Sequence, residues 1–286
     1  MPEPVSTNSE SPTAATIAFI GGGNMARSLI GAQLARGMPV ASLRVAEPRT
    51  EARDALVREF GVATFSDNAE AVAGANCVVL AVKPQVIRQV CEGLAAPLAH
   101  SRLLVISIAA GIRLAQLERL LGAGRAIVRC MPNTPALVGA GASGLCANQN
   151  VDAAQRALAE SLLDAAGIVR WIDDEARMDT VTALSGSGPA YFFLLVEAME
   201  DAAVKLGLPR ETARALAAQT CLGAGRMLAD GEETAAALRK RVTSPHGTTA
   251  AALDTFEQGG LRELVERALG AAERRGAAMS SELDAG

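Results

Sequence analysis

Three small residues between an apolar run and a helical segment carry the strongest chemical signal in this sequence. Gly21, Gly23 and Ala26 match the pattern G-x-G-x-x-G/A. In that pattern the first glycine makes a tight turn and the second lets a pyrophosphate approach the backbone. Amides at the start of the following helix then face the phosphates. Glu47 ends the next predicted strand, where an acidic residue binds the adenosine ribose. We predict a dinucleotide site here; the alternative is a strand-turn-helix without a ligand.

Other candidate residues follow the remaining predicted strands, because ligands bind at the carboxyl ends of parallel strands. Lys83 lies in AVKPQ and is either a cofactor residue or a solvated lysine. Asn133 lies in MPNTP and either binds a carboxamide or braces a turn between prolines. In the second half, the polar turn 244–249 precedes a predicted helix over 250–258, and amides and hydroxyls at a helix N-terminus suit a carboxylate. Alternatively, Thr248 only caps that helix.

The elements that must position these residues change character along the chain. Residues 16–172 alternate short apolar runs with helical segments, the pattern of βαβ units. Several runs are apolar at nearly every position, as in strands covered on both faces, so we predict a doubly wound parallel sheet with an added flank. The expected strands are 16–20, 42–46, 62–65, 76–82, 102–109, 125–131, 143–148 and 168–172, with helices at 24–36 and 50–60.

From residue 173 the strand signal ends and helices follow, punctuated by Gly and Pro. One is expected from Pro189 to Leu206, and another from Pro209 to Asp230. The stretch 190–204 is apolar around most of its circumference and must be buried on most sides, which favours pairing with a second subunit over a central place in a monomeric bundle. We expect flexible ends at residues 1–15 and 279–286.

Composition excludes several classes of function. The 286 residues carry a net charge of −4 and only 3% aromatic residues, which argues against a nucleic-acid partner. Five cysteines without a C-x-x-C pair indicate buried thiols in a reducing cytoplasm, and two histidines argue against a metal site. The N-terminus lacks basic residues and no apolar run reaches eighteen residues, so neither export nor a membrane span is expected.

Six segments in order, GGGNMA, AVKPQ, SIAAG, MPNTPA, SGSGPAY and SPHGTT, resemble the pyrroline-5-carboxylate reductase family over residues 16–276. The resemblance implies an α/β fold in which an N-terminal Rossmann domain (16–172) precedes an all-α dimerisation and substrate domain (173–286). It also implies a homodimer, often within a ring of dimers. Such enzymes reduce the cyclic imine L-1-pyrroline-5-carboxylate to L-proline, the last step of proline biosynthesis, with NADPH or NADH.

The resemblance also implies the site residues. Thr249 is expected to be catalytic and to reach the imine nitrogen, and Glu175 to be a peripheral acid on the substrate side. The substrate-binding set is Glu175, Ser244, Gly247, Thr248 and Thr249. The cofactor-binding set is Ile20, Gly21, Gly22, Gly23, Asn24, Met25, Ala46, Glu47, Arg49, Asn68, Ala81, Val82, Lys83, Pro84, Ala109, Ala110, Gly111 and Asn133.

Two positions leave alternatives open. His246 stands where the family has glycine, so either this position does not demand glycine or histidine tolerates a positive φ here. His246 is either a general acid, because imidazole exchanges protons near neutral pH, or a solvent-facing turn residue. Glu47 favours a free ribose 2′-hydroxyl, whereas Arg49 is near enough to pair with a 2′-phosphate. We expect NADPH, with NADH also accepted.

Two other classes of protein fit the sequence less well. A β-hydroxyacid dehydrogenase needs a lysine within a helix, but Lys205 lies at a helix end. A cofactor sensor without catalysis would not need the intact turn 244–249.

Overall fold

A computed structural model describes residues 15–285, which form two compact units. The sheet unit comprises the chain up to Gly186 together with residues 276–285, and the helical unit comprises 187–275. This division differs from the predicted boundary at 172/173, because the segment after the last strand packs on the sheet. Val181 comes so close to Gly144 that a Cβ added to the glycine would lie 2.6 Å from Val181 Cγ1, and Met178 is buried in the core.

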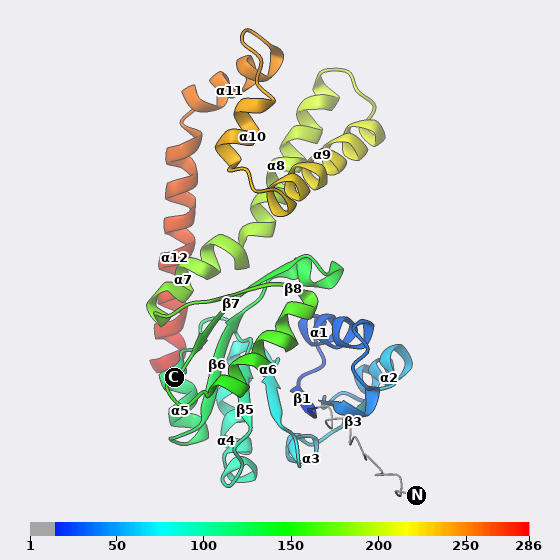
Figure 1. The fold of residues 1–286 in the computed structure, drawn as a ribbon, viewed down its shortest axis with the longest axis vertical. Helices are drawn as coiled ribbons and strands as arrows, with labels where there is room; N and C mark the ends of the chain where they lie inside the picture. The colour runs from blue at the N-terminus through cyan, green and yellow to red at the C-terminus, as the bar shows by residue number, and fades with distance from the viewer. Residues whose placement is uncertain (1–14, 286) are drawn as a thin grey trace, which may run out of the picture. The chain divides into compact units, whose positions relative to one another are not determined.

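The sheet has eight strands in the order β3-β2-β1-β4-β5-β6-β7-β8 (Figure 1). The pairs among β1 to β6 are parallel, which confirms the predicted doubly wound sheet. The predicted flank is β7 and β8, which are parallel to each other, while β7 runs antiparallel to β6. The strand order reverses between β1 and β4, so the ligand crevice of such a fold lies there. The strands are β1 (Ile17–Ile20), β2 (Leu43–Ala46), β3 (Ala63–Phe65), β4 (Cys77–Leu80), β5 (Leu104–Ser107), β6 (Ala126–Met131), β7 (Gly141–Ala147) and β8 (Gly167–Trp171).

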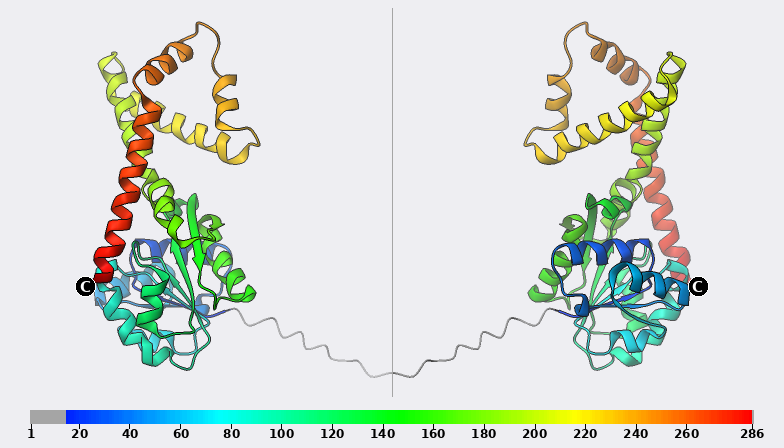
Figure 2. Two further views of the ribbon diagram at one scale, coloured as in Figure 1. Left: turned by 90° about the vertical axis from the view of Figure 1, so that its left-hand side faces the viewer. Right: turned by 90° about the vertical axis from the view of Figure 1, so that its right-hand side faces the viewer.

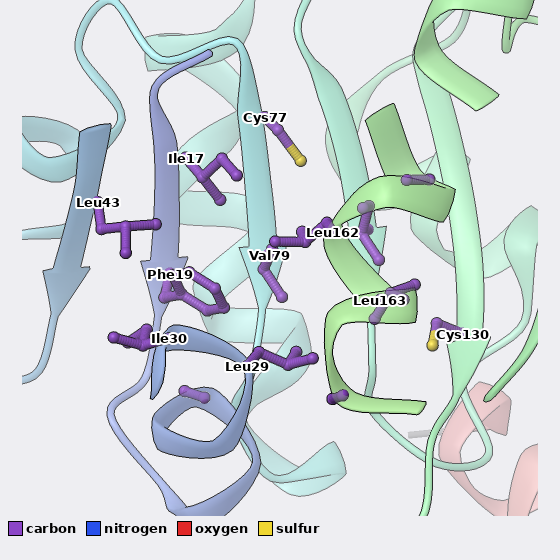
Figure 3. Packing of buried hydrophobic residues seen from close by; sticks show 14 of the residues in the cluster. Ile17, Phe19, Leu29, Ile30, Leu43, Cys77, Val79, Cys130, Leu162 and Leu163 are labelled. Atoms are coloured by element: carbon purple, nitrogen blue, oxygen red, sulfur yellow. The ribbon is translucent and has the colours of Figure 1, made fainter. Parts of the chain in front are cut away.

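Two hydrophobic cores cover the two faces of the sheet. Alternate residues of β1 point to opposite faces, so Ile17 and Phe19 join one core and Ala18 and Ile20 join the other. Side chains from α1 and α6 meet Phe19 and the neighbouring strands in the first core (Figure 3). Residues of α3, α4 and α5 fill the second. The helices are α1 (Asn24–Ala35), α2 (Thr50–Phe60), α3 (Asn68–Val72), α4 (Ile87–Leu98), α5 (Leu114–Leu121), α6 (Ala153–Leu163) and α7 (Met178–Val181).

The helical unit is built from α8 (Gly188–Lys205), α9 (Arg210–Asp230), α10 (Ala235–Arg241), α11 (Thr248–Gln258) and the first part of α12 (Leu261–Ala285). Helices α8 and α9 pack on each other. Phe192, Phe193 and Leu194 of α8 are nevertheless 60%, 67% and 66% exposed. Such an apolar surface needs a partner to cover it, as the sequence predicts. Within residues 15–285 no helix is both long enough and apolar enough to cross a membrane.

The C-terminal end differs from its prediction. Helix α12 continues without a break to Ala285 (Figure 2), and Ser280 is only 1% exposed. The expectation of a flexible end over residues 279–286 is therefore wrong for 279–285. The predicted N-terminal tail, 1–15, lies outside the described residues except for residue 15.

Candidate active site

The turn between β1 and α1 has the geometry that its three small residues predict. Gly21 has φ +99°, and a Cβ there would lie 2.7 Å from the carbonyl oxygen of Ala81. Gly23 is the N-cap of α1 and has no side-chain cap, and a Cβ on it would meet nothing within 4 Å. Ala26 is buried against the sheet. A pyrophosphate therefore fits here, because the backbone is open and the first amides of α1 have no capping side chain.

A crevice of about 850 Å³ opens at the carboxyl ends of β1, β2 and β4. Most of the residues predicted to bind the cofactor line it. These are Ile20, Gly21, Gly22, Gly23, Ala46, Glu47, Arg49, Asn68, Ala81, Val82 and Lys83. The lining does not include Asn24, Met25, Pro84, Ala109, Ala110, Gly111 or Asn133. Their cofactor roles stay predictions.

Sequence reasoning missed several lining residues. Asp67 could have been found, because its carboxylate accepts hydrogen bonds from the amides of Ala69 (2.8 Å) and Glu70 (3.1 Å) and so caps α3, a pattern visible in the sequence. The α4 residues carry no such signal, because only packing decides which face of a helix borders the crevice. The missed residues are Ser66, Asp67, Val86, Gln89, Val90 and Gly93.

The Glu47 side chain is hydrogen-bonded to the glycine turn between β1 and α1. Its Oε2 accepts a hydrogen bond from the amide of Gly22 (3.2 Å), and its Oε1 accepts from the Arg49 amide (3.2 Å) and Nε (3.0 Å). Burial alone would raise the pKa of Glu47, but these hydrogen bonds and the charge of Arg49 hold it below its usual range. Glu47 is therefore an ionised side chain that links β2 to the glycine turn.

Two loops follow β4 and its neighbour β5, and only the first of them lines the crevice. The loop with Ala81 and Lys83 follows β4, and the loop with Gly111 follows β5, which pairs with β4. The Lys83 side chain is exposed and lines the crevice. Asn133 is buried, and its Oδ1 accepts from the amide of Ala142 (2.9 Å) while its Nδ2 donates to the carbonyl of Ser185 (3.0 Å). These contacts favour a bracing role for Asn133.

Glu175 belongs to a charge cluster inside the sheet unit. Its Oε1 accepts from the amide of Leu114 (2.8 Å) and from Nη1 of Arg129 (3.1 Å). The Arg129 side chain is almost fully buried and also pairs with Asp179 at 3.4 Å. Glu175 thus holds the start of α5, and its part in substrate binding stays a prediction.

The predicted substrate turn, 244–249, opens α11 in the helical unit. Gly247 is the N-cap of α11, and its amide donates to the carbonyl of Ser244 (3.1 Å). The alternative in which Thr248 caps the helix is therefore wrong, because Thr248 is already the first helical residue. The hydroxyls of Ser244, Thr248 and Thr249 have no hydrogen-bond partner within residues 15–285, so they are available to a ligand.

His246 is the one non-glycine residue with positive φ (+62°) in the part of the chain that the structure describes. Of the two explanations for the departure from glycine, this backbone confirms that histidine tolerates a positive φ here. The side chain is exposed.

Positive charge precedes the turn, which sequence reasoning missed although RKR directly precedes VTSPHGTT. The last turn of α10 carries Arg239, Lys240 and Arg241. Arg241 pairs with Glu233, and Arg239 lies 3.8 Å from Glu257. Lys240 has no ion-pair partner among residues 15–285. This charge and the N-terminus of α11 both favour an anionic substrate group.

A glycine turn at the switch point of a doubly wound sheet, with an acidic residue just after β2, defines a dinucleotide-binding protein of Rossmann type. Comparisons with known proteins make this class specific. A family model described as pyrroline-5-carboxylate reductase dimerisation matches residues 175–279. Another, described as NADP oxidoreductase, coenzyme F420-dependent, matches residues 16–111.

Individual relatives agree with the family models. Pyrroline-5-carboxylate reductase of Pseudomonas aeruginosa is 55% identical over 267 residues, covering 93% of this chain and 97% of that protein. The structure of a pyrroline-5-carboxylate reductase from Coxiella burnetii has a TM-score of 0.90 at 45% identity, covering 93% and 98% of the two chains. That of Plasmodium falciparum pyrroline carboxylate reductase with NADP bound has a TM-score of 0.81 at 32% identity, covering 93% and 98%.

The chain belongs to the pyrroline-5-carboxylate reductase family. Family membership confirms the predicted fold class and the predicted enzyme class, an oxidoreductase that uses NAD(P)H and acts on a C=N bond. It also argues against the two alternative classes, a β-hydroxyacid dehydrogenase and a cofactor sensor without catalysis.

Proposed function

We propose that this protein reduces L-1-pyrroline-5-carboxylate to L-proline, with NADPH as the preferred cofactor and NADH also accepted. The observation that carries the proposal is the turn 244–249, whose unpartnered hydroxyls gather at the N-terminus of α11. A substrate carboxylate is stabilised there by the first amides of the helix. A cofactor sensor would not need this arrangement.

The chain's own residues would mainly bind and orient the substrate. When bound, the reduced nicotinamide supplies a hydride, which the imine carbon C5 accepts most readily when its nitrogen is protonated. Ser244, Gly247 and Thr248 hold the carboxylate. Thr249 hydrogen-bonds the imine nitrogen and so fixes the ring. No strongly acidic side chain is needed, because water or the already protonated imine supplies the proton.

Arg49 supports the preference for NADPH. Its Nε hydrogen-bonds Glu47, and neither Nη atom has a partner within residues 15–285. Two free NH₂ groups on an exposed guanidinium suit a 2′-phosphate, which accepts paired hydrogen bonds from arginine. Glu47 opposes this preference but leaves room for the 2′-hydroxyl of NADH.

The activity is tested by following the nicotinamide absorbance while pyrroline-5-carboxylate is added to the protein with NADPH or NADH. We expect the imine to accelerate oxidation of both cofactors, and NADPH to give the higher kcat/KM. A reaction without imine and a reaction with a 3-hydroxy acid and NADP⁺ serve as controls. If the imine produces no acceleration with either cofactor, the proposed function is wrong.

We also propose that the active species is a homodimer, arranged further into a ring of dimers. The exposed apolar side chains of α8 and the family's dimerisation model support the pairing. Obligate interfaces of this kind bury roughly 2,000 Å² or more. Sedimentation under assay conditions should show no active monomer, and an active species no larger than a dimer would contradict the ring. The unpaired cysteines, four of them buried, support a place in the reducing cytoplasm.

A further inference from the structure

The last turns of α12 lie against the loop that follows β5. Gly111 in this loop has φ +75°, a conformation that favours glycine. A Cβ on Gly111 would lie 3.4 Å from Leu283 Cδ1 and 3.7 Å from both Met279 Cβ and the backbone nitrogen of Ser280. The loop backbone therefore rests directly on this end of the helix.

This end of α12 is fixed to the sheet unit. The carbonyl of Ser280 accepts a hydrogen bond from Nε2 of Gln116 (3.4 Å), while Oε1 of Gln116 accepts from the amide of Arg113 (2.7 Å). Gln116 thus joins α12 to the end of the β5 loop. Leu283 adds an apolar contact, because it packs against the second core.

Buried charge holds the end of the same loop. Leu114, the first residue of α5, donates its amide to Glu175, whose carboxylate is paired with the buried Arg129. Ala109 and Ile112 are themselves buried. The loop is thus held by the α12 end, by Gln116 and by Glu175.

Topology places this loop on the nicotinamide side of the crevice. In a fold of this kind a bound pyrophosphate would lie at the switch point beside β1, and Glu47 marks the adenosine side at β2. A dinucleotide that crosses the sheet edge then extends its other half beyond β1 towards β4 and β5. The β5 loop is therefore in the right place to border the nicotinamide ring.

We propose that residues 279–283 of α12 are positioning residues for hydride transfer. They hold the loop 109–113, and through it the surface against which the nicotinamide ring lies. This inference rests on the proposed function for the identity of the ring, but its structural part concerns only cofactor binding. Residues 261–275 of the same continuous helix belong to the helical unit, so one helix contributes to both units.

The test replaces Leu283 with alanine and compares two ligands by calorimetry. NADPH contains both halves of the dinucleotide, whereas 2′,5′-ADP contains only the adenosine half. We expect Leu283→Ala to weaken NADPH binding about fivefold, because a loosened contact must be ordered on binding, and to leave 2′,5′-ADP binding unchanged. The kcat for imine reduction should fall about tenfold, since a small misplacement of a reacting group is costly. Leu283→Met should restore both values.

Leu163→Ala is the matched control, because it removes a buried leucine from α6 in the other core. We expect it to lower the thermal midpoint but to change neither kcat nor the ratio of the two affinities. If Leu283→Ala does not fold, Leu283→Val gives the same comparison with a smaller truncation. A ratio of NADPH to 2′,5′-ADP affinity equal to that of the unaltered protein would overturn the inference. If the unaltered protein does not reduce the imine, only the proposed function is wrong. The ratio of the two affinities would still decide whether residues 279–283 position the loop.

Discussion

Glu47→Ser should raise the ratio of kcat/KM for NADPH to that for NADH. The substitution removes a buried carboxylate from the edge of the cofactor crevice. That carboxylate accepts a hydrogen bond from the amide of Gly22 (3.2 Å), and the serine keeps a hydroxyl near the same amide. It also releases Arg49, whose Nε lies 3.0 Å from the carboxylate. Both changes favour a 2′-phosphate, and neither helps a 2′-hydroxyl.

The size of the effect follows from exposure. The Glu47 side chain is 8% exposed but that of Arg49 is 72% exposed, so their ion pair is screened by solvent and releasing Arg49 costs at most about 1 kcal/mol. Removing the repulsion between a carboxylate and a phosphate at the edge of a solvated crevice contributes about 1 kcal/mol for NADPH. A lost hydrogen bond from the 2′-hydroxyl costs NADH about 1.5 kcal/mol. Together we expect the ratio to rise about tenfold or more.

The assay measures kcat/KM for both cofactors at saturating imine in the unaltered protein, Glu47→Ser and Glu47→Gln. The glutamine variant keeps the shape and removes only the charge, so a similar rise in both variants shows that electrostatics is the cause. Arg49→Ala is the opposing control and should lower kcat/KM for NADPH while sparing NADH. An unchanged ratio in both Glu47 variants would show that this side chain points away from the ribose and would refute the reasoning.

Four further predictions concern catalysis and stability. Thr249→Val keeps shape and branching but removes the hydroxyl, so kcat/KM for the imine should fall about 10²-fold with cofactor affinity unchanged; wild-type kinetics would leave Thr249 without a chemical role. His246→Gly should keep kcat/KM within about threefold, because glycine adopts φ +62° readily and the imidazole is exposed, whereas a general acid would lose more. Arg129→Met should lower the free energy of unfolding by about 3 kcal/mol in denaturant titrations, because it leaves the buried carboxylate of Asp179 with only the half-exposed Arg113, 4.0 Å away, as a charge partner; a loss under 1 kcal/mol would show that Arg113 and water compensate. Because the pKa of Glu47 is lowered in the folded state, its carboxylate stabilises the fold fully above pH 4.5, the ordinary pKa of a glutamate, and this stabilisation is lost as the pH falls through the folded-state pKa. The difference in free energy of unfolding between the unaltered protein and Glu47→Gln should therefore shrink in acid. A difference that stays constant with pH would show that the pKa of Glu47 is not lowered.

Local signals in the sequence were sufficient for much of the sheet unit. The helix over 50–60 was predicted with the bounds that α2 has, because a charged face, an apolar stripe and a following glycine lie within one short stretch. The turn with Gly21, Gly23 and Ala26 is equally predictable, since its three small residues lie at a characteristic spacing within six positions of the sequence. The substrate turn was recognised through its resemblance to a family, and its residue chemistry alone left two interpretations open.

Other features depend on contacts between residues far apart in the chain, which no local pattern encodes. The antiparallel entry of β7 and the packing of Val181 on Gly144 moved the boundary between the units. Oε2 of Glu47 accepts a hydrogen bond from Gly22, twenty-five residues away in the turn after β1. The polar sequence of residues 279–286 resembles a flexible end, yet Ser280 is buried because one face of α12 meets the β5 loop. Sequence alone thus determined the elements and the chemistry of their residues, whereas the tertiary structure decided which side chains are free to meet a ligand, because hydrogen bonds and burial are settled only when distant segments pack together.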